Sequence, residues 1–123
     1  MDDQVMTTQE VAARFKELAQ QEKWFEIQDE LFADNVKSVE PANSPFFKNE
    51  EGKATVRKKG EDWESRVKEA YKLSTSEPVV AGKHFSVARE TDIMVEGIGR
   101  VYINEIMLYE VKDGQIILEQ FFY

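Results

Sequence analysis

Apolar residues recur every three or four positions through the first third of the chain, and this spacing predicts two amphipathic helices. The first begins at a capping box, Thr7-Thr8-Gln9-Glu10, and runs to about Gln21. The second is shorter and ends near Ala33. Their apolar stripes are Val11, Phe15 and Leu18 in the first helix and Trp24, Ile27 and Leu31 in the second. Each helix therefore presents one apolar face to a core.

The chain then becomes extended, because Pro41 disfavours helical backbone angles at Glu40. Residues 35–40 are expected to form a short strand and residues 41–52 a loop. The loop contains two adjacent aromatic residues, Phe46 and Phe47, which are costly to expose. This pair favours a loop that folds over an opening.

A third helix is predicted from Lys53 to Leu73, where the same helical spacing returns. Its expected inward positions are Val56, Gly60, Trp63, Val67, Ala70 and Tyr71. Gly60 stands out, because glycine inside a helix costs about 1 kcal/mol relative to alanine. On an inward face it indicates close packing or open space.

The rest of the chain has the composition and alternation of strands, which are predicted at residues 79–95, 100–112 and 115–123. Turns at residues 96–99 and 113–114 separate them. Three helices followed by an antiparallel meander indicate an α+β fold with helices on one face of a curved sheet. A length of 123 residues suits a single domain.

The Asp113-Gly114 turn predicts the register of the last two strands, because a two-residue hairpin places Lys112 opposite Gln115. Alternation then assigns one face to Val101, Ile103, Glu105, Met107, Tyr109, Val111, Ile116, Leu118, Gln120 and Phe122. Only Glu105 and Gln120 are strongly polar in this set. An ionised glutamate on such a face is costly, so Glu105 is expected to have either a raised pKa or a charged partner.

Two interpretations of Glu105 stay open. A glycine bulge in the turn at residues 96–99 places Arg89 opposite Glu105, and the two would then form a structural ion pair. Otherwise Glu105 serves a ligand or a proton transfer. The opposite face of the sheet mixes large apolar side chains with charges, and we expect it to form a homodimer.

Composition narrows the functional classes. The 24 acidic side chains exceed the 16 basic ones and give a net charge of -8, which disfavours nucleic acid as a partner. The basic run at residues 56–59 precedes several acidic residues and predicts a solvated helix surface. Cysteine is absent, which excludes disulfides and thiolate catalysis. With one histidine, His84, we expect no metal and no cofactor, and His84 is predicted to be structural.

The first ten residues, MDDQVMTTQE, lack the basic flank and apolar core of a signal peptide. No apolar run approaches the length of a membrane span. We therefore expect a soluble cytoplasmic protein with no membrane partner.

The order of the elements and several motifs resemble the SnoaL-like branch of the nuclear transport factor 2-like superfamily. The resembling motifs are VAARFKEL, LFADNVKSVEP, GKATVRKKGEDW and MLYEVKDGQIILEQFFY, which together span nearly the whole chain. Polyketide cyclases and ketosteroid isomerases share this cone-shaped α+β fold. The resemblance implies one domain over residues 1–123, with three N-terminal helices on the concave face of a curved antiparallel sheet.

The same resemblance implies roles for two acids. Ketosteroid isomerases use an acidic residue before a proline as the general base, and Glu40 occupies the similar position. Their second acid donates a hydrogen bond to the enolate from a strand that resembles NEIMLYEV, where Glu105 is the nearest match. The tyrosine that these enzymes place on the first helix is replaced here by Phe15.

We therefore expect a small-molecule cavity between the sheet and the helices, with Glu40 and Glu105 as catalytic candidates. The expected ligand-binding residues are Phe15, Trp24, Trp63, Tyr109, Gln120 and Phe122. The implied chemistry is proton transfer on a small apolar carbonyl compound, in an isomerisation, cyclisation or dehydration. The alternative is a non-catalytic dimer that uses the fold to bind a ligand or as a scaffold.

Overall fold

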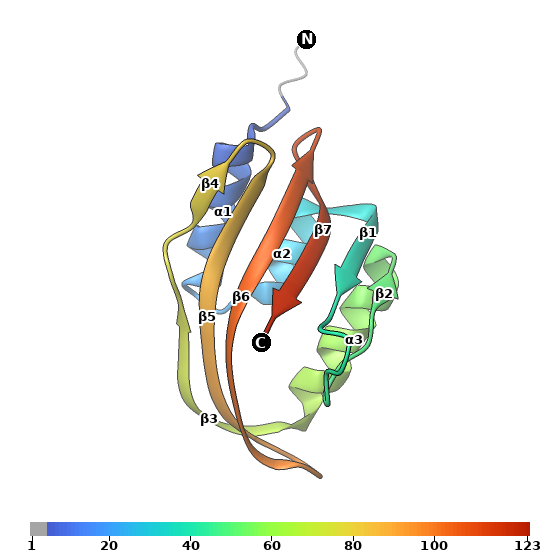
Figure 1. Ribbon diagram of the computed structural model, residues 1–123, viewed down its shortest axis with the longest axis vertical. Coiled ribbons are helices and arrows are strands. Elements are labelled where there is room, and N and C mark those ends of the chain that lie inside the picture. Colours follow the sequence, from blue (N-terminus) through green and yellow to red (C-terminus); the bar gives the residue numbers. More distant parts are fainter. Residues whose placement is uncertain (1–4) are drawn as a thin grey trace.

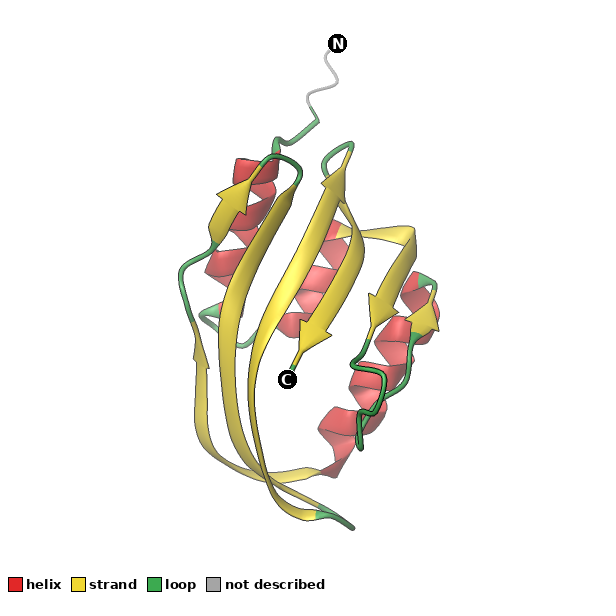
Figure 2. Cartoon of the chain, viewed as in Figure 1, coloured by secondary structure: helices red, strands yellow, loops and turns green. Residues whose placement is uncertain are grey.

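The computed structural model describes residues 5–123, and it shows three helices against one face of a strongly curved sheet (Figures 1 and 2). The helices are α1 (Thr8–Ala19), α2 (Trp24–Leu31) and α3 (Lys53–Arg66). The strands are β1 (Phe32–Val39), β2 (Glu50–Glu51), β3 (Val67–Thr75), β4 (Val79–Ala81), β5 (His84–Val95), β6 (Gly99–Lys112) and β7 (Gln115–Phe122). The expected α+β class and the number of helices are confirmed for this part of the chain.

The first helix begins as its sequence predicts. The Thr7 hydroxyl accepts a hydrogen bond from the Glu10 amide, and the Glu10 carboxylate accepts one from the Thr7 amide at 2.8 Å. This reciprocal pair satisfies two amides that a helix start leaves without partners. The predicted apolar stripe of α1 is buried against the sheet.

The third helix is shorter than the prediction. It ends at Arg66, and the following residues form β3, which pairs antiparallel with β5. Val67, Ala70 and Tyr71 are therefore strand residues, and their expected place on a helix face is wrong. Pairing with β5 satisfies the backbone groups of this segment, and the β-branched and aromatic residues in it favour strands.

The sheet has the strand order β2-β1-β7-β6-β5-β3, and β4 also pairs with β5. Neighbouring strands are antiparallel except β1 and β7, which run parallel. The long strands β5 and β6 extend past the end of β7 and curve away from it (Figure 1). This curvature shapes the concave side on which the helices lie.

The hairpin between β6 and β7 starts in the predicted register, with Lys112 opposite Gln115. The register then shifts, because β7 accommodates one extra residue at Ile117 as a bulge. Beyond the shift Tyr109 lies opposite Glu119. A strand has a side-chain period of two, so a shift by one residue exchanges the two faces of β7.

The bulge corrects three predicted inward positions. Leu118, Gln120 and Phe122 lie opposite Glu110, Leu108 and Ile106, so all three belong to the outer face of the sheet. Glu119 is buried on the inner face in their place. The predicted inward placement of Leu118, Gln120 and Phe122 is therefore wrong.

Two apolar clusters support the concave side. The larger one lies under α1 and α2, where the ring of Phe15 contacts Tyr109 at 4.7 Å between centroids, and Phe85 stacks on Tyr109 at 5.1 Å. The smaller one surrounds Ile93 and Ile103 and packs against Trp63. Several polar side chains lie between these clusters.

The two clusters and the corrected register predict opposite results for two phenylalanine truncations. Phe15 is 0% exposed, so Phe15→Ala should lower the free energy of unfolding by about 3–5 kcal/mol. Phe122 is 49% exposed, so Phe122→Ala should change it by no more than about 0.5 kcal/mol in the monomer. Urea unfolding of both variants measures this; comparable losses would contradict the shifted register of β7.

Candidate active site

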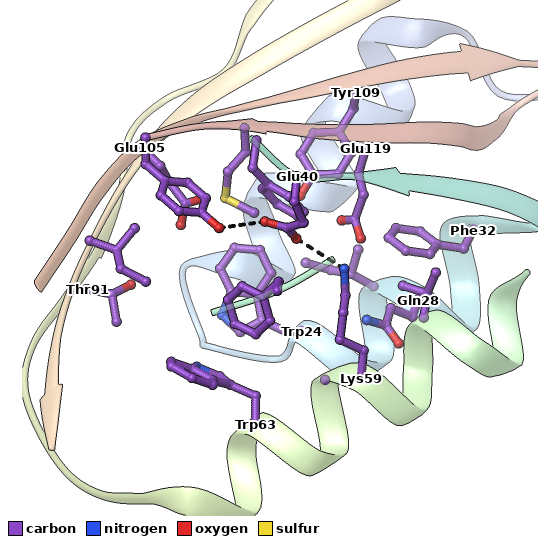
Figure 3. Close-up of a pocket in the computed structure, with 18 residues that line it drawn as sticks. Trp24, Gln28, Phe32, Glu40, Lys59, Trp63, Thr91, Glu105, Tyr109 and Glu119 are labelled. Atoms are coloured by element: carbon purple, nitrogen blue, oxygen red, sulfur yellow. Dashed lines mark hydrogen bonds and ion pairs between the residues drawn. The ribbon is translucent and has the colours of Figure 1, made fainter. Parts of the chain in front are cut away.

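A cavity of about 200 Å³ lies between the helices and the concave face of the sheet (Figure 3). Its apolar walls come mainly from aromatic side chains of α2, α3, β6, β7 and the loop after β1. These rings are Trp24, Phe32, Phe47, Trp63, Tyr109, Phe121 and Tyr123. Three carboxyl groups, Glu40, Glu105 and Glu119, and one amine, Lys59, reach the same space.

Glu40 lies at the end of β1, where Pro41 follows. Lys59 donates a hydrogen bond to one of its carboxylate oxygens at 3.1 Å, and the Tyr123 hydroxyl donates to the other at 2.7 Å. The Glu40 amide donates to the side-chain oxygen of Asn49 at 2.7 Å. The carboxylate is thus buried and held by two donors, and the Asn49 contact fixes the backbone of Glu40.

Lys59 is the cation of the cavity. Besides Glu40, its ammonium donates to the Ser38 hydroxyl at 2.9 Å, and it lies 5.7 Å from the ring centre of Phe47. Its side chain is only 16% exposed. The predicted solvent exposure of the basic run is therefore wrong for Lys59.

The helical period explains the position of Lys59. Val56 and Trp63 are inward residues of α3, and Lys59 lies three residues after the first and four before the second. It therefore shares their face, as does Gly60, and all four line the cavity. The helical spacing in the sequence places Lys59 on the inward face, but the charged residues next to it favoured a prediction of solvent exposure.

Glu119 lies at the inner side of β7, where the bulge turns it toward the helices. The Ser38 hydroxyl donates to its carboxylate at 2.9 Å. Burial raises the pKa of Glu119 to about 7, although the Lys59 charge and the Ser38 hydrogen bond act in the opposite direction. Burial and the nearby Glu119 charge also raise the pKa of Tyr109 well above its ordinary value.

Glu105 projects from β6 into the cavity without a hydrogen-bond partner in residues 5–123 (Figure 3). Burial raises the pKa of Glu105 to about 7, and the charge of Glu40 adds to this effect. The charge of Arg89 lowers the pKa, but does not offset the burial. Of the two alternatives expected for Glu105, a raised pKa or a charged partner, its surroundings favour the raised pKa.

Arg89 lies opposite Glu105 in the sheet, as the predicted turn requires. Its guanidinium nevertheless binds the Glu22 carboxylate with two hydrogen bonds, at 2.7 and 2.8 Å, and donates to Thr75 at 3.0 Å. Arg89 also lies over the ring of Trp24, 4.9 Å from its centre. The structural ion pair between Arg89 and Glu105 is therefore not formed, because Glu22 in the turn between α1 and α2 takes its place.

Tyr123 was not among the predicted site residues. Its hydroxyl lies 2.6 Å from the Ser44 hydroxyl as well as donating to Glu40. Burial raises the pKa of Tyr123 above its ordinary range. The hydrogen bond to Ser44 lowers this pKa, and the hydrogen bond to Glu40 raises it. Tyr123 thus links Glu40 to the loop after β1, whose Phe47 packs on Trp63 at 4.7 Å between ring centres.

The predicted site residues divide into two groups. Glu40, Glu105, Trp24, Trp63 and Tyr109 line the cavity. Phe15 lies behind it in the core, and Gln120 and Phe122 lie on the outer face of the sheet. Sequence reasoning missed Lys59, Glu119 and Tyr123.

Other candidate features lie apart from the cavity. His84 is the first residue of β5. Its side chain lies 3.5 Å from that of Glu110, and it does not line the cavity. Residues 5–123 contain no group of three His, Cys, Asp or Glu side chains placed to hold a metal ion. Over the same range, no helix combines the length and the apolar character that a membrane crossing requires.

The structure defines an α+β protein with an acid-lined cavity between its helices and its sheet, and comparison with known proteins specifies the family. The SnoaL-like domain model matches residues 6–123, so the chain belongs to the SnoaL-like family. A Mesorhizobium loti protein named as a SnoaL-like polyketide cyclase is 31% identical, with a TM-score of 0.88, and the alignment covers 96% of this chain and 100% of that one.

More distant structures show the same fold. An NTF2-like protein of Burkholderia pseudomallei is 11% identical with a TM-score of 0.72, over 96% of this chain and 92% of that one. Bal32a, from a soil-derived mobile gene cassette, is 14% identical with a TM-score of 0.74, over 94% and 87%. Among curated proteins, none matches the chain significantly.

The environment of Glu105 predicts a pH-dependent difference in stability. A glutamate with a higher pKa in the folded protein holds its proton more tightly there, so its contribution to stability is lost as the pH rises from about 4.5 to about 7. Glu105→Gln removes this loss. Relative to wild type, the variant should gain on the order of 3 kcal/mol in unfolding free energy between about pH 4 and about pH 8.

Urea unfolding at several pH values measures the difference. Glu51→Gln is a matched control, because Glu51 is exposed on β2 and outside the cavity. The unfolding free energy of Glu51→Gln should change with pH in the same way as that of wild type. Parallel curves for wild type and Glu105→Gln would contradict the raised pKa.

Proposed function

We propose that this protein binds a small carbonyl compound in the cavity and catalyses proton transfer at the carbon next to the carbonyl group. The supporting observation is that two carboxyl groups with opposite surroundings, Glu40 and Glu105, face one aromatic cavity. One is paired with a cation and the other has no partner within the described residues. Pairs of acids whose environments differ in this way suit separate base and acid roles.

Glu40 suits the role of general base. Lys59 and Tyr123 each donate a hydrogen bond to one of its carboxylate oxygens, and each oxygen can accept more than one hydrogen bond. A free lone pair therefore remains to take a proton from the substrate carbon. The same donors hold the carboxylate in one orientation, which lowers the entropy cost of the reaction.

Glu105 suits the role of hydrogen-bond donor. With a pKa of about 7, a substantial fraction of this carboxyl is protonated near neutral pH. The protonated carboxyl can then donate a hydrogen bond to the carbonyl oxygen, where negative charge develops as the enolate forms. A donor in a site with little water stabilises that charge more than it would in bulk solvent.

The size of the cavity limits the reacting part of the substrate. The volume of the cavity is about 200 Å³. This lies below the range of about 300–1,000 Å³ that drug-sized ligands require. The reacting part is therefore a short chain or a single ring, and the aromatic walls favour an apolar one.

A non-catalytic ligand-binding or scaffold role is the second candidate, and the free Glu105 argues against it. A carboxyl without a partner in a largely apolar cavity costs stability. A pure scaffold gains nothing from that cost. An exchange experiment separates the two roles.

Carbonyl exchange tests the proposed chemistry directly. In deuterated water, the protein should accelerate the replacement of hydrogen by deuterium next to the carbonyl group of cyclohexanone, as followed by proton NMR. Glu40→Gln should slow the catalysed exchange by a factor of about 10² or more, and Glu105→Gln should slow it as well. Glu51→Gln should leave it unchanged.

Two results would count against the proposal. Exchange by Glu40→Gln at the wild-type rate would exclude Glu40 as the base. Bound cyclohexanone without accelerated exchange in wild type would favour the non-catalytic role.

We also propose that the outer face of β6 and β7 forms the interface of a homodimer. Ile106 lies opposite Phe122 on this face and is 46% exposed, and Tyr102 is exposed on the same strand. Apolar side chains gathered on one sheet face are typical of subunit contacts. The cavity lies on the opposite side of the sheet and stays open to its ligand.

Light scattering coupled to gel filtration tests the dimer. Wild type should elute with the mass of two chains, and Ile106→Lys should elute with the mass of one. Ile98→Lys, an exposed apolar position in the turn between β5 and β6, is the control and should remain dimeric. A wild-type mass of one chain would contradict the proposal.

A further inference from the structure

A second chamber of about 380 Å³ adjoins the acid-lined cavity, between α2 and α3 on one side and β3 and β5 on the other. The two spaces share part of their walls. The shared residues are Trp24, Gln28, Gly60, Trp63 and Thr91. Because the same side chains border both, the two chambers lie directly side by side.

The second chamber is predominantly apolar away from its shared wall. The residues that line only this chamber include Phe25, Val67, Ala70, Leu73 and Ile93. Three charged residues line it: Glu22 and Arg89 bind each other at 2.7 Å, and Glu64 is exposed on α3. Leu73 is 39% exposed at its edge on β3. Such walls suit a hydrocarbon or an aromatic group and, within residues 5–123, offer no unpaired cation for an acidic one.

Besides the two tryptophans, the boundary between the chambers consists of a glycine and two polar side chains. Gly60 leaves out a side chain whose first carbon would lie 3.1 Å from the ring of Phe25. Thr91 faces the cavity from β5 (Figure 3) and makes no side-chain hydrogen bond within the described residues. The side-chain oxygen of Gln28 is buried there without a partner in residues 5–123. A larger residue at Gly60 would crowd the place where the two chambers meet.

We infer that the ligand is an elongated carbonyl compound, with its polar head beside Glu40 and Glu105 and an apolar tail that extends between Trp24 and Trp63 into the second chamber. The inference rests on the proposed function for the position of the head. It adds the class of ligand: a ketone or aldehyde with an apolar tail several carbon atoms long. It also explains why the acid-lined cavity alone is small.

A homologous series of straight-chain methyl ketones, beginning with butanone and lengthening by one methylene at a time, tests the inference. Dissociation constants are measured by NMR shift titration of the protein. In wild type, each added methylene that enters the second chamber should lower the dissociation constant about fourfold, the factor that corresponds to about 0.8 kcal/mol per buried methylene.

Two variants block the tail while sparing the head. Ala70→Trp and Leu73→Trp fill the second chamber from its exposed rim on β3, where an aromatic residue is compatible with a strand. Both should bind butanone as wild type does, and both should lose the gain in affinity with chain length. Ala81→Trp is the matched control, because Ala81 is exposed on β4 and lines neither chamber.

The outcomes separate the two proposals. Wild-type binding and exchange of butanone, with no gain on lengthening, would overturn the two-chamber ligand and leave the proton-transfer proposal intact. A gain with length that Ala70→Trp preserves would place the tail elsewhere and would also overturn it. A gain that Ala70→Trp removes, without catalysed exchange, would support the ligand class and reject the chemistry. If no ketone binds, both proposals fail.

Discussion

The ammonium group of Lys59 is the contact on which the whole site depends. It binds Glu40 directly, and it reaches Glu119 through the Ser38 hydroxyl. Three carboxyl groups around one small cavity repel each other when ionised, and one cation inside that cavity makes the arrangement tolerable. Lys59 can do this only because α3 crosses β1 with Val56 and Trp63 inward, which turns the ammonium to the same side.

A second charge contact keeps the site asymmetric. Arg89 is placed by the sheet next to Glu105, but its guanidinium is held by Glu22 and the ring of Trp24. Arg89 and its partner Glu22 therefore form part of the wall of the second chamber. Within residues 5–123 Glu105 has no hydrogen-bond partner, whereas the Glu40 carboxylate accepts from Lys59 and Tyr123. The difference between a paired and a free carboxyl is what makes separate base and donor roles possible.

The helix starts, the Asp113-Gly114 turn and the placement of Arg89 opposite Glu105 follow from local sequence signals. Capping boxes and tight hairpins are decided by a few neighbouring residues, so the sequence reveals them. The family resemblance added the concave cavity and correctly put Glu40 and Glu105 at its edge. Trp24, Trp63 and Tyr109 were also predictable, since each lies on an apolar face.

The remaining errors come from tertiary contacts. The bulge at Ile117 depends on how β7 fits between β1 and β6, and no turn residue in the sequence predicts it. Because of this bulge, Glu119 and Phe121 line the cavity, and Gln120 and Phe122 lie on the outer face of the sheet. The end of α3 at Arg66 depends on pairing between β3 and β5, which periodicity cannot show. Lys59 looked solvated because its neighbours are charged, although its helical position was inward.

In the proposed reaction, Glu105 donates a hydrogen bond to an oxygen that gains negative charge while the ring or chain of the ligand lies against Trp24 and Trp63. A crystal structure with a small phenol, whose oxygen resembles that of an enolate, tests this most directly. We expect the phenol oxygen within about 3 Å of the Glu105 carboxyl and the ring against the two tryptophans. A phenol oxygen bound by Lys59 instead, or a ring seated outside the cavity, would contradict the proposed role of Glu105.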